Sequence, residues 1–147
     1  MMSNDPNIKF LLIALLTCLV VVGCDVRAPV SGKVTFPDGS PLTVGEIRGY
    51  GDGSHIRANI GEDGTFELYE VMPNDKVPAG KTYEIFIANA EKRGEVVMPP
   101  GGGPPVAPPS VTPLIDSKFS NPVTSGLRLE VPKSSKPVEY NIEVTKP

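Results

Sequence analysis

Residues 55–71 read HIRANIGEDGTFELYEV and decide the predicted fold. Apolar and polar residues alternate on both sides of a central Asp-Gly pair, and this alternation places the apolar side chains on one face of a β-strand. Asp-Gly is typical of a tight hairpin turn. The stretch therefore predicts two paired strands that turn one face toward a core. That face carries Ile56, Ala58, Ile60, Phe66 and Leu68.

The same period of two recurs on both sides of this hairpin. Residues 82–89 are rich in β-branched and aromatic side chains and give the strongest strand signal. Residues 44–50 alternate less regularly and precede Gly51-Asp52-Gly53, so we expect an edge strand or a bulged strand there. No helix is expected after residue 24. Seven strands are predicted, at 30–36, 44–50, 55–60, 65–71, 82–89, 127–131 and 138–145.

Strands with one apolar face are best covered by a second sheet. The sequence therefore predicts an all-β fold, a seven-stranded antiparallel Greek-key β-sandwich that follows an N-terminal signal helix. Each large apolar side chain buried contributes about 1.5–3 kcal/mol. The expected core is Val30, Val34, Phe36, Ile56, Ile60, Phe66, Leu68, Tyr83, Ile85, Ile87, Leu127, Leu129, Tyr140, Ile142 and Val144.

One segment interrupts the alternation. Residues 98–113 read MPPGGGPPVAPPSVTP, and this density of proline and glycine predicts a long loop without a ladder of backbone hydrogen bonds. Two interpretations stay open. The loop is a spacer between strands, or its paired prolines form an extended left-handed helix that fits an aromatic groove on another protein.

The N-terminal region reads as an export signal. The apolar run at 10–22 is thirteen residues long and interrupted only by Thr17. It is shorter than the roughly 20 residues that cross a bilayer, but it fits the apolar part of a secretory signal. Val21-Val22-Gly23-Cys24 resembles the bacterial lipobox, in which a diacylglyceryl group is attached to the cysteine before cleavage on its amino side. The alternatives are an ordinary cleaved signal and an uncleaved anchor. The lipobox predicts a signal peptide at 1–23, a lipidated tether at 24–29 and a β-domain at 30–147.

Charge and cysteine content exclude several classes of function. The chain of 147 residues has 14 Lys and Arg against 17 Asp and Glu, a net charge of −3, which argues against a nucleic-acid surface. Of its two cysteines, Cys18 lies in the predicted signal. A mature chain that begins at Cys24 would then hold one cysteine, Cys24, and one histidine, His55, as possible metal ligands. We therefore expect no disulfide inside the domain, no structural zinc site and no cofactor.

The sequence offers few residues for catalysis or metal binding. His55 follows Ser54, but adjacent residues on a strand point to opposite faces, so this pair does not predict a nucleophile with its base. Acidic residues in glycine-containing loops could offer oxygens to calcium, but they lack the spacing of a calcium loop and turn formation explains them better. These residues are Asp38, Asp52, Glu62 and Asp63. No catalytic residue and no metal ligand is predicted.

Two further features of the sequence bear on function. Lys33 and Asn141 lie on the first and last predicted strands, but the alternation places both side chains on the solvent-facing side. An isopeptide bond between them would need an apolar, buried setting, so it is disfavoured. Carbohydrate binding uses exposed aromatic side chains, and four aromatic residues remain outside the predicted core: Tyr50, Tyr69, Phe86 and Phe119.

Four motifs carry a resemblance to a known family. They are SGKVTFPDGSPL at 31–42, GEDGTFEL at 61–68, VPAGKTYEI at 77–85 and NPVTSGLRLEV at 121–131. In this order they resemble bacterial lipoproteins with a carboxypeptidase-regulatory-like domain, a transthyretin-like (prealbumin-like) β-sandwich. The resemblance implies the fold and supplies no catalytic residues.

The sequence thus predicts a non-enzymatic lipoprotein of the cell envelope. It would be held by membrane lipid through acylated Cys24, face the periplasm or the cell surface, and use its β-sandwich as a structural or protein-interaction module with an envelope protein partner. The alternative is an envelope protein that binds a small ligand or carbohydrate.

Overall fold

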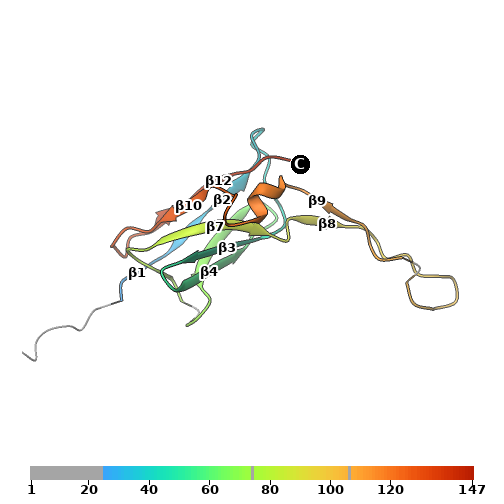
Figure 1. The fold of residues 1–147 in the computed structure, drawn as a ribbon, viewed down its shortest axis with the longest axis horizontal. Coiled ribbons are helices and arrows are strands. Elements are labelled where there is room, and N and C mark those ends of the chain that lie inside the picture. The colour runs from blue at the N-terminus through green and yellow to red at the C-terminus, as the bar shows by residue number, and fades with distance from the viewer. Residues whose placement is uncertain (1–24, 74, 106) are drawn as a thin grey trace, which may run out of the picture.

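The computed structural model describes residues 25–73, 75–105 and 107–147, and the described chain is all-β (Figure 1). The all-β prediction is confirmed. The predicted signal helix lies outside the described residues. The strands are β1 (Arg27–Ala28), β2 (Val30–Thr35), β3 (Glu46–Gly51), β4 (Ser54–Asn59), β5 (Thr65–Glu70), β6 (Val77–Pro78), β7 (Thr82–Ala88), β8 (Glu91–Arg93), β9 (Val111–Pro113), β10 (Leu127–Glu130), β11 (Val138–Glu139) and β12 (Ile142–Glu143), and one 3-10 helix, η1, spans Ser117–Ser120.

The main sheet has the order β10-β7-β3-β4-β5-β2-β11, and β12 also pairs with β2. Strand β5 joins its two halves. Its first residues pair with β2, with Leu68 opposite Val30, and its last residues pair with β4, with Glu70 opposite Ile56. This change of partner curls the sheet around its own apolar face. Two smaller ladders, β1 with β6 and β8 with β9, complete the described strands.

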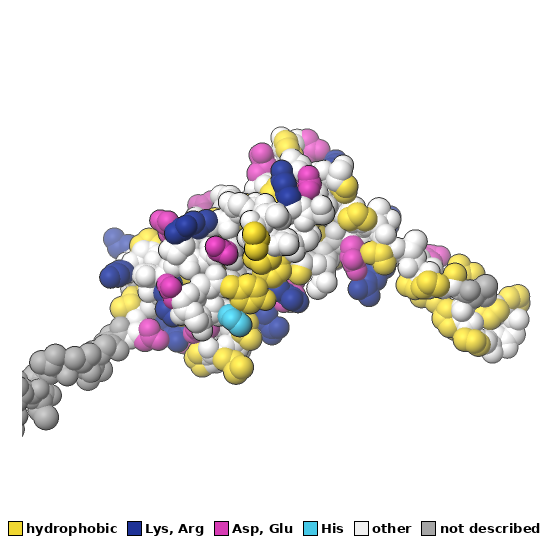
Figure 2. All heavy atoms as spheres, viewed as in Figure 1, with side chains coloured by type: hydrophobic (Ala, Val, Ile, Leu, Met, Phe, Trp, Pro, Cys, Tyr) yellow, Lys and Arg dark blue, Asp and Glu magenta, His cyan; other side chains and the backbone are white. Residues whose placement is uncertain are grey.

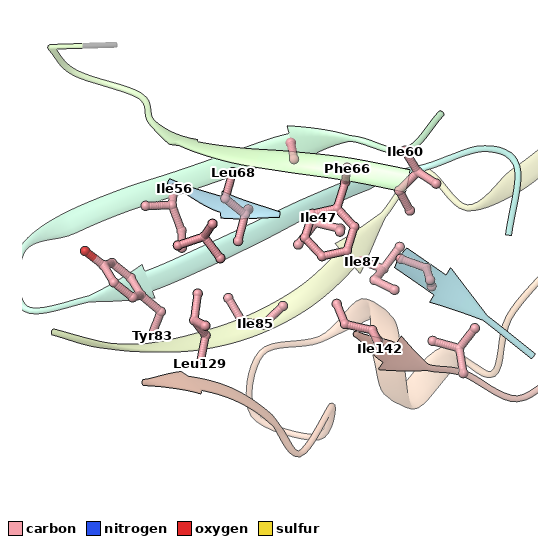
Figure 3. Packing of buried hydrophobic residues seen from close by; sticks show 14 of the residues in the cluster. Ile47, Ile56, Ile60, Phe66, Leu68, Tyr83, Ile85, Ile87, Leu129 and Ile142 are labelled. Carbon is pink, nitrogen blue, oxygen red and sulfur yellow. The ribbon is translucent and has the colours of Figure 1, made fainter. Parts of the chain in front are cut away.

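The core fills the inside of this curl (Figure 3). Most of the predicted core residues are buried there, while Leu127 and Tyr140 are only partly buried and pack against the cluster. The predicted core omitted several buried residues, most of them in short or irregular segments. These are Ala28, Leu42, Ile47, Val77, Ala90, Ile115, Phe119 and Val131.

Strand β3 corrects the expectation for residues 44–50. It is neither an edge nor a bulged strand, because β7 pairs with it on one side and β4 on the other. Its glycines are required by close packing. A Cβ at Gly49 would lie 2.6 Å from Ile85 Cδ1 and 2.7 Å from Ile56 Cγ1, and one at Gly51 would overlap the carbonyl of Thr82. The irregular sequence therefore marks a crowded central strand.

The C-terminal segment corrects the prediction of seven antiparallel strands. The predicted strand 138–145 consists of two short strands, β11 and β12, and both run parallel to β2. Antiparallel β10 and parallel β11 lie at opposite ends of the sheet order, yet only residues 131–137 connect them. Seven extended residues span at most about 25 Å. The connection is short because the curl brings both ends to one core, which holds Leu129 and Ile142 (Figure 3).

The proline-rich loop and the segment after it differ from expectation at three points. Residues 111–113, predicted within the loop, form β9 and pair with β8 in a short antiparallel ladder. Phe119, predicted to lie outside the core, is buried on η1. That 3-10 turn was not expected, and among the described residues no helix has the length and apolarity to cross a membrane.

We predict that Gly49→Val destabilises the protein by about 1–3 kcal/mol, because the added side chain overpacks the core against Ile56 and Ile85. Urea unfolding at equilibrium measures this change in the free energy of unfolding. Gly103→Ala is the control, because its Cβ would meet only Pro99, at 3.3 Å. Equal stability of both variants would contradict the packing account of β3.

Candidate functional site

The predicted lipidation site, Cys24, and the lipobox residues Val21, Val22 and Gly23 lie outside the described residues. The description begins at Asp25, and β1 follows two residues later. Strand β1 is attached to the body by its ladder with β6 and by the bond from the Ala79 N–H to the Val26 carbonyl, 2.8 Å long. The chain is thus fixed to the domain within residues 24–29, which the sequence predicted as a tether, and the folded body begins before residue 30.

A partly buried ion pair reinforces this attachment. Arg27 Nη1 on β1 donates to Glu70 Oε2 on β5 at 2.6 Å and to the Lys76 carbonyl at 3.0 Å. Only 19% of the Arg27 side chain and 10% of the Glu70 side chain are exposed. Ser54 Oγ donates to the other carboxylate oxygen of Glu70 at 2.5 Å. Arg27 also lies 3.3 Å from a carboxylate oxygen of Asp25.

The protonation of Glu70 follows from these contacts. Burial alone would raise the pKa of Glu70, but the hydrogen bonds from Ser54 and Arg27 and the charge of Arg27 outweigh it, so the pKa lies below its ordinary value. The same hydrogen bond with Glu70 raises the pKa of Arg27. The carboxylate and guanidinium are therefore both charged at neutral pH. We call Arg27, Ser54 and Glu70 the clamp.

A second feature is an arm that projects from the body at the end away from β1 (Figure 1). We define the arm as residues 91–113. Its base is the β8–β9 ladder, which the bond from the Gly94 N–H to the Ser110 carbonyl extends, 2.8 Å long. Beyond the ladder, Val96, Val97 and Met98 are 48%, 65% and 60% exposed. Figure 2 shows hydrophobic side chains along this projection.

A third feature is a shallow depression on the outer face of the main sheet, which we call the basin. Its volume is about 250 Å³. Cross-strand pairs of β3 and β4 line it, with Arg48 opposite Arg57 and Tyr50 opposite His55. Figure 2 shows the single histidine of the chain at the surface beside hydrophobic side chains.

Each side chain of the basin is held by a neighbour. Arg48 donates to Glu46 Oε2 from Nε at 2.9 Å and from Nη2 at 2.6 Å. Arg57 Nε donates to the Tyr69 hydroxyl at 2.7 Å, and its guanidinium carbon lies 5.4 Å from the centre of that ring. The Tyr50 ring centre lies 4.7 Å from that of His55 and 5.5 Å from that of Phe86. The basin therefore combines two guanidinium groups with a supported aromatic ring.

Ser54 and His55 lie on opposite faces of β4, and each belongs to a different feature. Ser54 is buried and donates to Glu70 in the clamp, while His55 is exposed and packs against Tyr50 in the basin. They do not form a nucleophile with its base.

Two of the four loop carboxylates, Asp38 and Asp63, stabilise turns. Asp38 Oδ1 accepts from the Ser40 N–H at 2.9 Å, and Asp63 Oδ1 accepts from the Thr65 N–H at 3.1 Å. Hydrogen bonds from Ser40 and Thr65 lower the pKa of Asp38 and of Asp63. In the part of the chain that the structure describes, no three His, Cys, Asp or Glu residues come together as metal ligands.

Lys33 and Asn141 do lie together, but through the backbone. The Lys33 N–H donates to Asn141 Oδ1 at 3.0 Å, and Asn141 Nδ2 donates to Glu139 Oε1 at 2.7 Å. The side-chain oxygen of Asn141 thus takes the place of a backbone carbonyl as the acceptor for β2 in the gap between β11 and β12. Both residues are exposed, as their parity predicts.

Of the four aromatic candidates, two were assigned wrongly. Phe86 and Phe119 are buried, with exposures of 8% and 6%. Phe86 is covered on the outer face beside Tyr50, and Phe119 belongs to the core. Tyr50 and Tyr69 remain at the surface, and both contribute to the basin or its support.

Sequence reasoning missed the clamp and the basic part of the basin. The basin had a signal, because Arg48, Tyr50, His55 and Arg57 share the outward parity of two neighbouring strands. The clamp had none, since 43 residues separate Arg27 from Glu70. Comparisons of this chain with protein-family models, with curated proteins and with solved structures found no match.

We predict that Glu70→Gln lowers the free energy of unfolding by about 1.5–3 kcal/mol at pH 7, because it removes a charge-assisted hydrogen bond in a buried place. The folded state depresses the pKa of Glu70, so its stabilising contribution is present above the ordinary glutamate pKa of about 4.3 and is lost as the pH falls through the folded value. Urea unfolding between pH 7 and pH 3 should show the two proteins converge.

Glu67→Gln is the matched control, because Glu67 lies on the same strand and is exposed. It should change stability by less than about 0.5 kcal/mol. A Glu70→Gln deficit of equal size at pH 3 and pH 7 would refute the ionic role of the clamp.

Proposed function

We propose that this chain is a lipid-anchored lipoprotein of the cell envelope, without enzymatic activity, whose β-domain presents the arm to a protein partner. One observation carries the proposal: the arm exposes consecutive apolar side chains on a hydrogen-bonded base. Large exposed apolar groups that gather at one place are typical of interaction sites. Proline-rich segments bind aromatic-lined grooves at low entropic cost, so such a groove is the partner chemistry we propose.

The lipid anchor is proposed from Val21-Val22-Gly23-Cys24. Two acyl chains on Cys24 would give lasting attachment, because each buried CH₂ contributes about 0.8 kcal/mol and a single chain is marginal. The clamp supports this proposal, since it fixes β1 only three residues after the cysteine. The arm at the other end of the body would then face away from the lipid surface (Figure 1).

The four motifs quoted above support a finer assignment of the fold. We propose that the body is a carboxypeptidase-regulatory-like, transthyretin-like Greek-key sandwich in which β5 passes between the two layers. The parallel pairing of β11 and β12 with β2 is then a local departure from the antiparallel pattern of that fold.

A second candidate function is the binding of a small ligand or carbohydrate. The observation that favours it is the basin, where aromatic and basic side chains meet on an open sheet face. This function is compatible with the anchor and does not depend on the arm.

We expect Cys24→Ser to abolish labelling by radioactive fatty acid in cells and to move the protein from the membrane fraction to the soluble fraction. Cys18→Ser is the control and should leave both unchanged, because Cys18 lies in the segment predicted to be cleaved. A Cys24→Ser protein that still fractionates with membranes would refute the lipid anchor.

We expect a photo-crosslinking amino acid at Val97 to give a discrete adduct in whole cells, whereas the same group at Val123, which is 85% exposed on the body, should not. Val96→Ser combined with Met98→Ser should abolish the adduct, because both substitutions remove apolar contact area. Identical adducts from the two positions, or an adduct that survives both substitutions, would argue against the arm as the binding element.

A further inference from the structure

The basin carries an unusual charge arrangement for an open sheet. Arg48 and Arg57 are directly opposite each other on neighbouring strands, and like charges in that position destabilise a sheet. Glu46 compensates Arg48, but the contact of Arg57 is the neutral Tyr69 hydroxyl. Among the described groups that line the basin, two arginines therefore face one carboxylate, with a net positive charge. A bound anion would relieve this repulsion.

The guanidinium groups have donors to spare for such an anion. Each guanidinium carries five N–H donors in a planar fork that matches a carboxylate. Arg57 uses Nε for Tyr69, and Arg48 uses Nε and Nη2 for Glu46. Arg57 is exposed, and 41% of the Arg48 side chain is exposed. Both arginines are also held in place, so little side-chain entropy would be lost on binding.

An aromatic surface lies beside these donors. Tyr50 is 41% exposed, and its ring is fixed between His55, which meets it edge-on at 79°, and Phe86, which lies at 31° to it. A fixed ring with an exposed part offers an apolar contact with a polar tip. On the β7 side, Glu84 is the register partner of Tyr50, so an acidic group borders the ring without lining the basin.

The size of the basin limits what it can hold. Its volume of about 250 Å³ is below the range of about 300–1,000 Å³ that is typical of pockets for drug-sized ligands. It therefore suits one ring of a larger molecule that continues across the open face. The ligand needs an apolar ring surface for Tyr50 and an anionic group for Arg48 and Arg57. It also needs hydroxyl groups for Glu46 and His55, the other polar side chains that line the basin.

We propose that the basin binds a carboxylated sugar ring of an acidic polysaccharide, with the carboxylate on Arg57 and Arg48 and the ring against Tyr50. This inference deepens the second candidate function and names its ligand class. It depends neither on acylation of Cys24 nor on the arm. A failed binding test would therefore leave the lipid anchor and the arm unaffected, and failure of either of those would leave this inference unaffected.

The test is calorimetric titration of the full chain with a trigalacturonate and with its methyl ester, which has the same rings without the charges. We expect the acid to bind at least about tenfold more tightly than the ester, because charge-assisted hydrogen bonds are the stronger kind. Arg57→Gln should weaken binding of the acid by about tenfold or more and leave binding of the ester unchanged. Tyr50→Ala should weaken binding of both, because it removes the ring surface.

Arg93→Gln is the matched control. Arg93 pairs with Glu91 two residues away, as Arg48 pairs with Glu46, but it lies on the arm. It should bind like the wild type. The unfolding temperature of Arg57→Gln should be no lower than that of the wild type, since the residue is exposed, lies outside the core and leaves Arg48 without a facing like charge.

Three outcomes would overturn the proposal. The first is equal affinity for the acid and its ester, or no binding of the acid at millimolar concentration. The second is an Arg57→Gln variant that binds the acid as well as the wild type does. The third is full competition by sulfate at the concentration at which the sugar acid binds, which would show a simple anion site without recognition of the ring.

Discussion

The fold depends on the change of partner along β5. This strand pairs with β2 over its first residues and with β4 over its last, and only this continuity closes the sheet over a single apolar face. The described chain contains no cysteine, so no disulfide holds the layers together. The closure therefore depends on side chains that β5 directs inward. Phe66 and Leu68 are buried in the core, and they bring the two halves of the sheet together.

The alternation of side chains along β5 also explains the position of the clamp. Residues 66, 68 and 70 share the inward face, so Glu70 follows two core residues into a place with little water. A carboxylate there is costly unless it is paired and hydrogen-bonded. Arg27 and Ser54 fulfil both needs from two other strands. The position of β1 thus follows from the position of Glu70 at the end of the core face of β5. The segment after Cys24 is joined to the domain by this ion pair as well as by the short β1–β6 ladder.

The sequence was sufficient where alternation was regular and insufficient where backbone packing decided the structure. Strands β4, β5 and β7 and most of the core were predictable, because one side-chain period determines their faces. The prediction of a tight hairpin around Asp63-Gly64 with strands paired along their length was wrong, since β4 and β5 pair only at Ile56 with Glu70 and at Arg57 with Tyr69. Strand β3 was misjudged because Gly49 gives no apolar signal, although it lies inward between Ile56 and Ile85. The parallel pairing of β11 was missed because direction is not encoded in alternation. Strand β9 was missed because prolines nearby conceal the short ladder with β8.

The candidate sites were less predictable, because each joins residues through pairing and not through sequence spacing. The outward parity of Arg48, Tyr50, His55 and Arg57 was readable, but their juxtaposition requires the register of β3 with β4. The register has a further consequence. A one-residue slip of β4 would direct His55 and Arg57 inward and Ile56 outward, since side chains alternate across a strand. Burial of Ile56 therefore holds the outer face in register. The register of β3 with β4 thus determines both which side chains enter the core and which line the basin. Substitutions confined to the outward side chains can therefore alter binding while leaving the fold intact.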